Sequence, residues 1–233
     1  MMDSLSVFFP AFNEEENIAE TVKKAIAVLK KLQIKNWEVI VVNDGSSDQT
    51  AKVANELAHK EPRIRVITQS NGGYGHALKT GFSSAKYPWV VYTDSDGQFD
   101  FAEVEKFIDK TKEADLILGF RIKRNDPPLR LVFAKGWKFM IFLFFGMSVK
   151  DVDCGFKMAR KKLIEQISPL ESSRGGMINA ELVLKARKSG FKISQVGVNH
   201  YPRLKGKPTG ANLKVIINSF LDLFKLRLEM MGN

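Results

Sequence analysis

The sequence predicts an α/β fold in which helices cover both faces of a mostly parallel sheet. Two observations lead to this prediction. Short apolar runs rich in β-branched residues recur through the first 120 residues, and a segment with helical periodicity follows each of the first four. Parallel strands that are buried on both faces show such continuous apolar runs. The 233 residues of the chain suffice for one domain of this kind and are too few for two.

The expected elements follow one another in a regular order. Strands are expected at residues 5–9, 38–42, 65–68, 89–93 and 115–118. Helices are expected after the first four strands, at residues 14–32, 49–58, 76–84 and 101–112. The alternation ends after Gly119, and Pro127 and Pro128 prevent a helix before Leu129. The elements expected beyond this point are a helix at 177–189, a strand at 192–198 and a helix at 212–231. The first half should therefore form a Rossmann-like sheet.

Charge divides the chain into two unlike halves. The whole sequence carries 36 Lys and Arg against 26 Asp and Glu, a formal net charge of +10. Residues 1–120 hold 14 basic and 18 acidic side chains, whereas residues 121–233 hold 22 and 8. A basic half favours an anionic partner, such as a phosphate substrate or an anionic lipid surface, although a solvated basic surface explains it equally well. We expect no nucleic-acid partner, because this half has no motif that combines stacking and basic residues.

The cellular compartment is predicted from the single cysteine and from the apolar runs. Cys154 cannot form an intrachain disulfide, which favours a reducing compartment. The first residues lack the basic and apolar stretches of a secretory signal. The longest apolar run, at residues 139–147, is far shorter than the ~20 residues of a membrane span. We therefore expect a cytoplasmic protein that does not cross a bilayer.

Polar, turn-forming loops follow the first four predicted strands, at residues 10–16, 43–48, 71–76 and 94–98. Ligands of parallel α/β sheets bind at the carboxyl ends of the strands, where these loops would meet. Turn and cap chemistry explains any one of them, with Asp48 and Asp100 as helix caps. Four such loops at one edge of the sheet predict a binding site there.

The run from Asp94 through Asp96 to Gln98 is the sharpest motif in these loops. Two carboxylates and an amide oxygen at alternate positions can converge on one hard cation, and Mg²⁺ completes such a shell with phosphate oxygens and water. A diphosphate leaving group needs this neutralisation as its charge develops. The sequence has neither GxGxxG after the first strand nor GxxxxGK[ST], which argues against NAD enzymes and P-loop NTPases.

Two segments of the basic half are candidates for contact with a membrane. Residues 129–147 combine Arg130, Lys135 and Lys138 with an aromatic-rich run, which is typical of an interfacial helix. Residues 212–231 carry an apolar stripe opposite charged positions, as an amphipathic helix does. Burial in the core or in a subunit interface explains both segments equally well. Their place in the basic half favours an anionic membrane surface.

Seven motifs, in order along nearly the whole chain, resemble those of the family 2 glycosyltransferases. They are PAFNEEENI at 10–18, VNDGSSDQT at 42–50, NGGYGHALKTG at 71–81, DSDGQF at 94–99, GFR at 119–121, DVDCGFK at 151–157 and HYPRLKGKPTG at 200–210. The last three are similar to the branch that contains dolichyl-phosphate mannose synthase and related polyprenyl-phosphate sugar transferases. The resemblance implies a GT-A fold and an inverting, metal-dependent transfer of a hexose. It implies a single domain, 1–233, with a nucleotide-sugar half at 1–120 and an acceptor and membrane-facing half at 121–233.

The resemblance also assigns roles to individual residues. The residues that would bind the nucleotide are Pro10, Phe12, Glu14, Asp44, Asp94 and Ser95. Asp94, Asp96 and Gln98 would hold Mg²⁺ or Mn²⁺. Arg121 and Arg203 would clamp the phosphates, and together with Asp96 they are the implied catalytic residues. Arg121 and Arg130 would receive the acceptor phosphate. Ser95 and Gly97 depart from the residues common in the family, but neither change removes a ligand.

The implied reaction moves mannose or glucose from GDP-mannose or UDP-glucose to a polyprenyl phosphate, such as dolichyl or undecaprenyl phosphate. It would take place on the cytoplasmic face of a membrane, with the protein bound peripherally. A phosphate monoester has a second pKa near ~6, so the acceptor is anionic at neutral pH and can attack the anomeric carbon without a general base. Catalysis then consists of positioning and of stabilising the diphosphate that leaves. Bidentate phosphate binding favours arginine over lysine at 121 and 203.

Two other interpretations stay open. A soluble family 2 transferase with a hydroxyl acceptor, in polysaccharide or glycoprotein synthesis, would need a carboxylate base. Asp151, Asp153 and Glu181 are the spare carboxylates, and Asp153 is the preferred catalytic candidate among them. A non-catalytic basic module that binds a membrane would tolerate the loss of Asp96 and would show salt-sensitive binding without metal.

Overall fold

The structure is a computed structural model, and it describes residues 2–123, 136, 139, 140, 142, 143, 146, 149–172 and 175–206. These residues form one sheet of seven strands in the order β3-β2-β1-β4-β6-β5-β7. The strands are β1 (Ser4–Ala11), β2 (Asn36–Asp44), β3 (Ile64–Gln69), β4 (Trp89–Tyr92), β5 (Leu116–Arg121), β6 (Lys157–Arg160) and β7 (Ile193–Val198). All neighbouring pairs are parallel except the two that involve β6. The predicted mostly parallel sheet is therefore confirmed.

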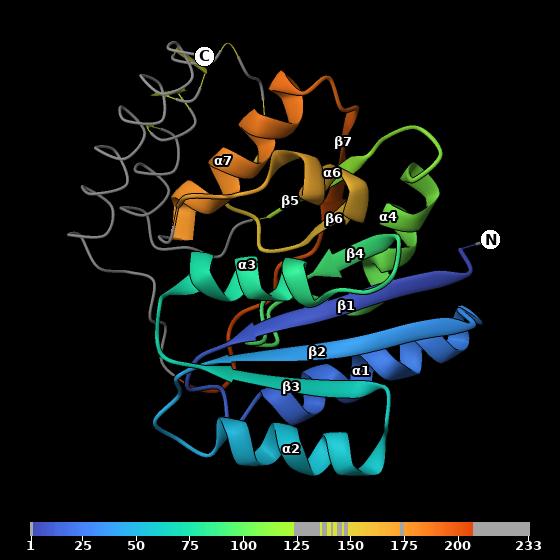
Figure 1. Cartoon of the computed structure of the whole chain (residues 1–233), viewed down its shortest axis with the longest axis vertical. Helices are drawn as coiled ribbons and strands as arrows, with labels where there is room; N and C mark the ends of the chain where they lie inside the picture. The colour runs from blue at the N-terminus through green and yellow to red at the C-terminus, as the bar shows by residue number, and fades with distance from the viewer. Residues whose placement is uncertain are drawn as a thin grey trace.

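Helices cover both faces of the sheet (Figure 1). They are α1 (Ile18–Lys31), α2 (Thr50–Lys60), α3 (Tyr74–Ser84), the 3-10 helix η1 (Phe101–Glu103), α4 (Val104–Lys110), α6 (Lys161–Ile167) and α7 (Gly175–Lys188). Buried residues of α1, α2 and α4 belong to one hydrophobic cluster, and those of α3, α6 and α7 belong to the other. The sheet thus lies between two helical layers.

The two cores arise from the alternation of side chains along each strand. Phe8 and Ile40 face the layer of α3, α6 and α7, whereas Val7, Phe9 and Val39 face the layer of α1, α2 and α4. All five side chains are fully buried. Successive residues of a strand point to opposite faces, so a strand that is covered on both sides is apolar at most positions. This requirement explains the continuous apolar runs of the sequence.

Three elements differ from the sequence-based expectation, and one of them is helix α6, which was not predicted. Helix α1 begins at Ile18 rather than near Glu14, because Asn13 adopts a left-handed conformation with φ 56° and the following residues form a loop. Strand β6 was not predicted, since its four residues contain no β-branched side chain. It forms because β4 and β5 both offer it an antiparallel edge.

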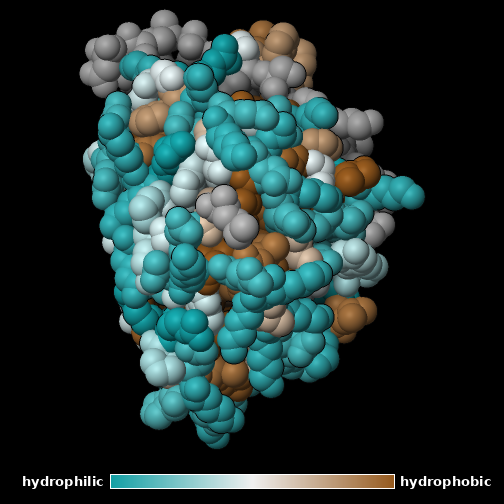
Figure 2. Space-filling model, turned by 90° about the vertical axis from the view of Figure 1, so that its right-hand side faces the viewer, coloured by the Kyte–Doolittle hydropathy of each residue, from teal (hydrophilic) through white to brown (hydrophobic). Residues whose placement is uncertain are grey.

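The segments predicted to be interfacial stay predictions. Residues 212–231 lie outside the described residues, and so does most of 129–147, including Arg130. Within the described part of the chain, no helix is both long enough and apolar enough to span a bilayer. Hydrophilic residues cover most of the face shown in Figure 2, and hydrophobic side chains are visible between them. The large apolar side chains that the described residues expose include Ile122, Tyr201 and Leu204.

Candidate active site

The ends of four strands and the start of a fifth lie at one edge of the sheet. In the parallel register Ala11 is opposite Asn43, and Phe8 is opposite Tyr92. Strand β6 runs the other way, so its first residue, Lys157, is the one opposite Tyr92. The four polar loops therefore meet at one edge, as predicted. The motif that precedes β6 is delivered to the same edge, because that strand is antiparallel.

The loops that follow β1 and β2 are joined by hydrogen bonds, and we call them the fastened loops. The backbone N–H of Asn13 donates to Ser46 Oγ (2.9 Å), and Asn13 Oδ1 accepts from the backbone N–H of Ser47 (2.8 Å). The N–H of Glu14 donates to Thr50 Oγ1 (2.8 Å). Asparagine tolerates the left-handed conformation that Asn13 adopts. These bonds fix the backbone of both loops before any ligand is bound.

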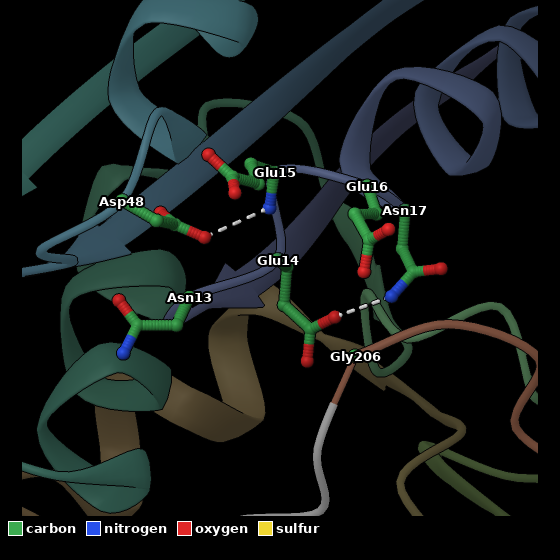
Figure 3. A pocket seen from close by; sticks show the side chains of 7 residues that line it. All are labelled: Asn13, Glu14, Glu15, Glu16, Asn17, Asp48 and Gly206. Atoms are coloured by element: carbon green, nitrogen blue, oxygen red, sulfur yellow. Dashed lines mark hydrogen bonds between the residues drawn. The ribbon is translucent and has the colours of Figure 1, made fainter.

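A pocket of about 260 Å³ lies beside these fastened loops (Figure 3). Its lining residues are Asn13, Glu14, Glu15, Glu16, Asn17, Asp48 and Gly206. Asn17 Nδ2 donates to Glu14 Oε2 (2.7 Å), and the N–H of Glu15 donates to Asp48 Oδ2 (3.2 Å). These two bonds hold side chains of the wall in place, and the wall is strongly acidic.

Arg203 connects the loop that follows β1 with the loop that follows β4. Its Nη2 donates to both carboxylate oxygens of Glu14 (2.8 Å each), and its Nη1 lies 3.5 Å from Asp96 Oδ2. The arginine side chain is only 14% exposed. One guanidinium is therefore shared between carboxylates that follow β1 and β4.

The segment that carries Arg203, residues 199–206, is fixed by Gln98 and Glu103. Gln98 accepts from the N–H of Tyr201 with its backbone carbonyl and donates to the Tyr201 carbonyl with Nε2 (2.9 Å each). Glu103 accepts from the backbone N–H (2.8 Å) and the side-chain amide (3.0 Å) of Asn199. Gln98, the predicted third metal ligand, thus uses its amide nitrogen to hold this segment.

Asp96 has an unusual electrostatic environment. Burial raises the pKa of Asp96 to about 7, and the neighbouring charge of Asp94 acts in the same direction. The N–H of Gln98, which donates to Oδ1 (3.0 Å), and the Arg203 guanidinium act against this rise. Two carboxylates in one partly buried place repel each other, and a divalent cation relieves that repulsion.

Asp94 is held from two sides. The phenol of Tyr74 donates to Asp94 Oδ1 (2.9 Å). On the other side lies Gly155, where an added Cβ would come within 2.5 Å of Oδ1 and closer still to Oδ2. The carboxylate therefore fills the space that the missing side chain of Gly155 leaves.

The residues at this edge fit a divalent metal of the kind that shares its shell with a ligand. Within the described ranges, no three His, Cys, Asp or Glu side chains are arranged to hold a metal ion. Asp94 and Asp96 provide two hard oxygen donors, and Mg²⁺ is commonly bound by one or two carboxylates together with substrate phosphates. The pair suits a metal that arrives with a diphosphate.

Besides Glu14 and Asp94, three more of the six predicted nucleotide-binding residues make contacts within the chain. Asp44 accepts from the N–H of Gly72 (3.0 Å) and of Gly73 (2.8 Å) and is 3% exposed. Ser95 is also 3% exposed, and its hydroxyl donates to the Pro10 carbonyl (2.8 Å). These groups order the loops at the site. The sixth residue, Phe12, is half-buried just after β1.

Arg121 lies in a closed ion pair. Its Nε donates to Asp151 Oδ2 (2.6 Å) and its Nη2 to Oδ1 (2.9 Å), and both side chains are 6% exposed. Sequence reasoning assigned Arg121 to a phosphate and Asp151 to the spare carboxylates, whereas the structure brings the two together. Bidentate pairs of this kind hold a fixed geometry.

Glu181 is also engaged. Its carboxylate accepts from the N–H groups of Glu171 (2.7 Å) and Ser172 (2.8 Å) and pairs with Lys185 (2.8 Å). Burial acts to raise the pKa of Glu181, but the bonds from Lys185 and the two N–H groups lower it below its usual value. The role of the third spare carboxylate, Asp153, as a base stays a prediction.

The sequence did not predict that Lys157, the first residue of β6, is buried and hydrogen-bonded to other buried groups. Lys157 is fully buried, and its Nζ donates to Asn179 Oδ1 (2.8 Å) and to the Cys154 carbonyl. Tyr92 donates its hydroxyl to the same Asn179 oxygen (2.8 Å). Burial lowers the pKa of Lys157. Tyr74, Gly155 and Lys157 all lie within the quoted motifs, so these motifs were the available signal.

The glycosyl transferase family 2 model matches residues 6–168. The chain belongs to this family. Among solved structures, glucosyl-3-phosphoglycerate synthase from Mycobacterium tuberculosis in complex with phosphoglyceric acid superposes with a TM-score of 0.73 at 21% identity, covering 96% of this chain and 79% of that one. The same synthase with Mn²⁺, UDP and glucosyl-3-phosphoglycerate gives 0.70 at 22% identity, covering 95% and 80%. The fold is therefore GT-A, as the motifs implied.

Curated relatives are more similar in sequence. A dolichyl-phosphate beta-glucosyltransferase of Trichomonas vaginalis is 30% identical over 207 residues, which cover 81% of this chain and 61% of the relative. The enzyme of the same name from Saccharomyces cerevisiae is 28% identical over 222 residues, 84% of this chain and 66% of the relative. An uncharacterized protein of Methanocaldococcus jannaschii is 33% identical over 241 residues, 97% and 92%. The chain thus spans less than two thirds of the length of the first two relatives.

Proposed function

We propose that the chain transfers glucose from UDP-glucose to a polyprenyl phosphate, with inversion and with Mn²⁺ or Mg²⁺. The relatives from T. vaginalis and S. cerevisiae, named as dolichyl-phosphate beta-glucosyltransferases, support glucose and the lipid acceptor. The M. tuberculosis synthase, crystallised with UDP-glucose and Mn²⁺, supports the donor and the metal. The sequence alone left mannose and GDP-mannose open beside glucose.

One observation carries the proposal: Asp94, Asp96 and Arg203 meet at the carboxyl edge of the sheet. Arg203 Nη1 lies 3.5 Å from Asp96 Oδ2, and burial together with the charge of Asp94 raises the pKa of Asp96. Two carboxylates suit the metal ion and a guanidinium suits the diphosphate, so the three side chains together match a metal–diphosphate group.

The bound metal would be held by Asp94 and Asp96 and would supply neutralisation of the diphosphate as it leaves. Arg203 would contribute from the opposite side. A diphosphate that enters this place competes with Glu14 and Asp96 for the guanidinium, and bidentate phosphate binding favours the exchange. The fastened loops beside Glu14 would hold the nucleoside, because their backbone is already fixed.

The acceptor side of the proposal rests on charge and on exposed apolar groups. A prenyl phosphate is its own nucleophile at neutral pH, so Asp153 need not act as a base. Ile122 follows Arg121 directly and is 56% exposed, while Leu204 follows Arg203 and is 90% exposed. An exposed apolar side chain next to Arg203 suits a lipid that carries a phosphate. A lipid acceptor would place the reaction at the cytoplasmic surface of a membrane.

The proposal is tested by incubating the purified chain with Mn²⁺, a panel of nucleotide sugars and a short-chain polyprenyl phosphate. We expect UDP release that depends on the lipid and is selective for UDP-glucose. Asp96→Ala should abolish it, and Asp109→Ala, which removes an exposed acid of α4, should leave it unchanged. Equal rates in the Asp96→Ala variant would contradict the proposal, as would release only with a hydroxyl acceptor. The latter outcome would favour the alternative in which Asp153 is a base.

A further inference from the structure

Tyr74 and Gly155 together enclose the carboxylate of Asp94. Tyr74 is the first residue of α3, and Gly155 lies two residues before β6. The phenol donates to Oδ1 (2.9 Å), and the bare Cα of Gly155 lies against both oxygens. Two elements that are far apart in the sequence therefore fix one side chain that follows β4.

The position of Tyr74 is itself fixed by the loop before it. The N–H groups of Gly72 and Gly73 donate to the Asp44 carboxylate (3.0 and 2.8 Å), and Asn71 Nδ2 donates to the Asp44 carbonyl (2.9 Å). Gly73 has φ 85°, a conformation that glycine adopts without strain. The chain can therefore turn at Gly73 and start α3 with the phenol directed at Asp94.

The phenol is a stable donor. A phenol has an ordinary pKa of ~10, so the hydroxyl is protonated at physiological pH and can donate to the carboxylate. A hydrogen bond to an ionised acceptor is stronger than one between neutral groups and restricts the acceptor's rotamer.

We propose that Tyr74 is a positioning residue for the metal-binding carboxylate of Asp94, with Gly155 as the wall against which that carboxylate rests. The inference rests on the proposed function, since it needs Asp94 to bind a divalent metal. Groups that orient metal ligands typically contribute 10–100-fold to metal affinity. Tyr74 acts through Asp94 and need not touch substrate.

The test is a titration of the full chain with Mn²⁺, followed by electron paramagnetic resonance, with and without UDP. Tyr74→Phe should weaken Mn²⁺ binding by roughly 10–100-fold. Tyr92→Phe is the matched control, because it also removes a buried phenol hydroxyl and one hydrogen bond, but that bond goes to Asn179. We expect the control to change Mn²⁺ affinity less than about twofold while its Tm falls as in Tyr74→Phe.

A second variant tests the contact between Gly155 and the Asp94 carboxylate. Gly155→Ala adds a methyl group that would collide with the Asp94 carboxylate. We expect Gly155→Ala to lose at least as much Mn²⁺ affinity as Tyr74→Phe. We expect both variants to bind UDP in the absence of metal as the wild-type chain does. The measurement of UDP binding without metal shows whether a variant affects metal binding alone or also disturbs the loop at residues 71–76, which contains Tyr74.

The outcomes separate this inference from the proposed function. If the wild-type chain binds Mn²⁺ and Tyr74→Phe binds it as tightly, Tyr74 is only a packing residue and the inference is wrong. If Mn²⁺ binding weakens as expected but no glucose reaches a lipid phosphate, the inference stands and the proposed function fails. A wild-type chain that binds no Mn²⁺ overturns both.

Discussion

Two arginines that the motifs assigned to the same task lie in two different kinds of region. Arg121 and Asp151 form a closed pair, both 6% exposed, with two short bonds between one guanidinium and one carboxylate. Arg203 is shared between Glu14 and Asp96, and its contact with Asp96 is 3.5 Å long. A buried bidentate pair holds a fixed geometry, whereas a shared arginine can exchange one anion for another. We therefore propose that Arg121 supports the structure of the site and that Arg203 takes part in the reaction.

The largest effect on stability is expected at the closed pair. Arg121→Met would leave the Asp151 carboxylate buried without its partner, which should cost about 3–5 kcal/mol of unfolding free energy. Urea denaturation measures this loss. Arg121→Met combined with Asp151→Leu should recover most of it, because no buried charge remains. If Arg121→Met alone were as stable as wild type, the proposed difference between Arg121 and Arg203 would be wrong.

The shared arginine should affect turnover instead. Arg203→Ala should lower kcat by about 10²–10³, the effect of losing one donor to charge that develops in a transition state. Arg203→Lys should restore only part of the rate, because lysine lacks the bidentate fork. Glucose transfer measured beside denaturation curves checks this. A variant that loses stability as Arg121→Met does, but keeps its kcat, would reverse the roles assigned here.

The burial of Asp96 beside Asp94 predicts a pH dependence of stability in the chain treated with EDTA. The pKa of Asp96 is about 7 in the folded chain and near 3.8 when unfolded. The folded chain therefore binds the extra proton between these values, and stability falls as pH rises through this window. Relative to Asp96→Asn, the unfolding free energy should fall by roughly 1.4 kcal/mol per pH unit. A constant difference between the two chains from pH 4.5 to 6.5 would show that Asp96 titrates normally.

The smallest effect is expected at an exposed pair. Lys24 and Glu20 lie one turn apart on α1, with side chains 68% and 67% exposed and 3.4 Å between their charged atoms. Lys24→Ala should change the unfolding free energy by less than about 0.5 kcal/mol, since solvent and salt screen the pair. Measured by the same denaturation experiment, this change in unfolding free energy is a lower reference for the changes at Arg121 and Arg203.

The sequence predicted the strongly patterned elements and missed those that depend on neighbours. Strands β1 and β2 are continuous apolar runs, so periodicity located them. Strand β6 has only Met158 and Ala159 as apolar residues, and its formation depends on edges that β4 and β5 provide. Helix α6 has seven residues, too few for a clear helical period.

The site was predicted in part for a similar reason. The acids after β4 were recognised because their spacing is local. The partners of Asp94 and Arg121 come from other elements, so no local pattern connects Tyr74 with Asp94 or Arg121 with Asp151. The motifs named most of these residues, whereas their pairing required the topology.

The antiparallel direction of β6 has a consequence for changes in the length of the chain. Because Gly155 comes just before a strand, its place beside Asp94 is set by the pairing of Lys157 with Tyr92 and Leu118. An insertion or deletion between β5 and Asp151 should therefore leave Gly155 beside Asp94, as long as β6 keeps its pairing.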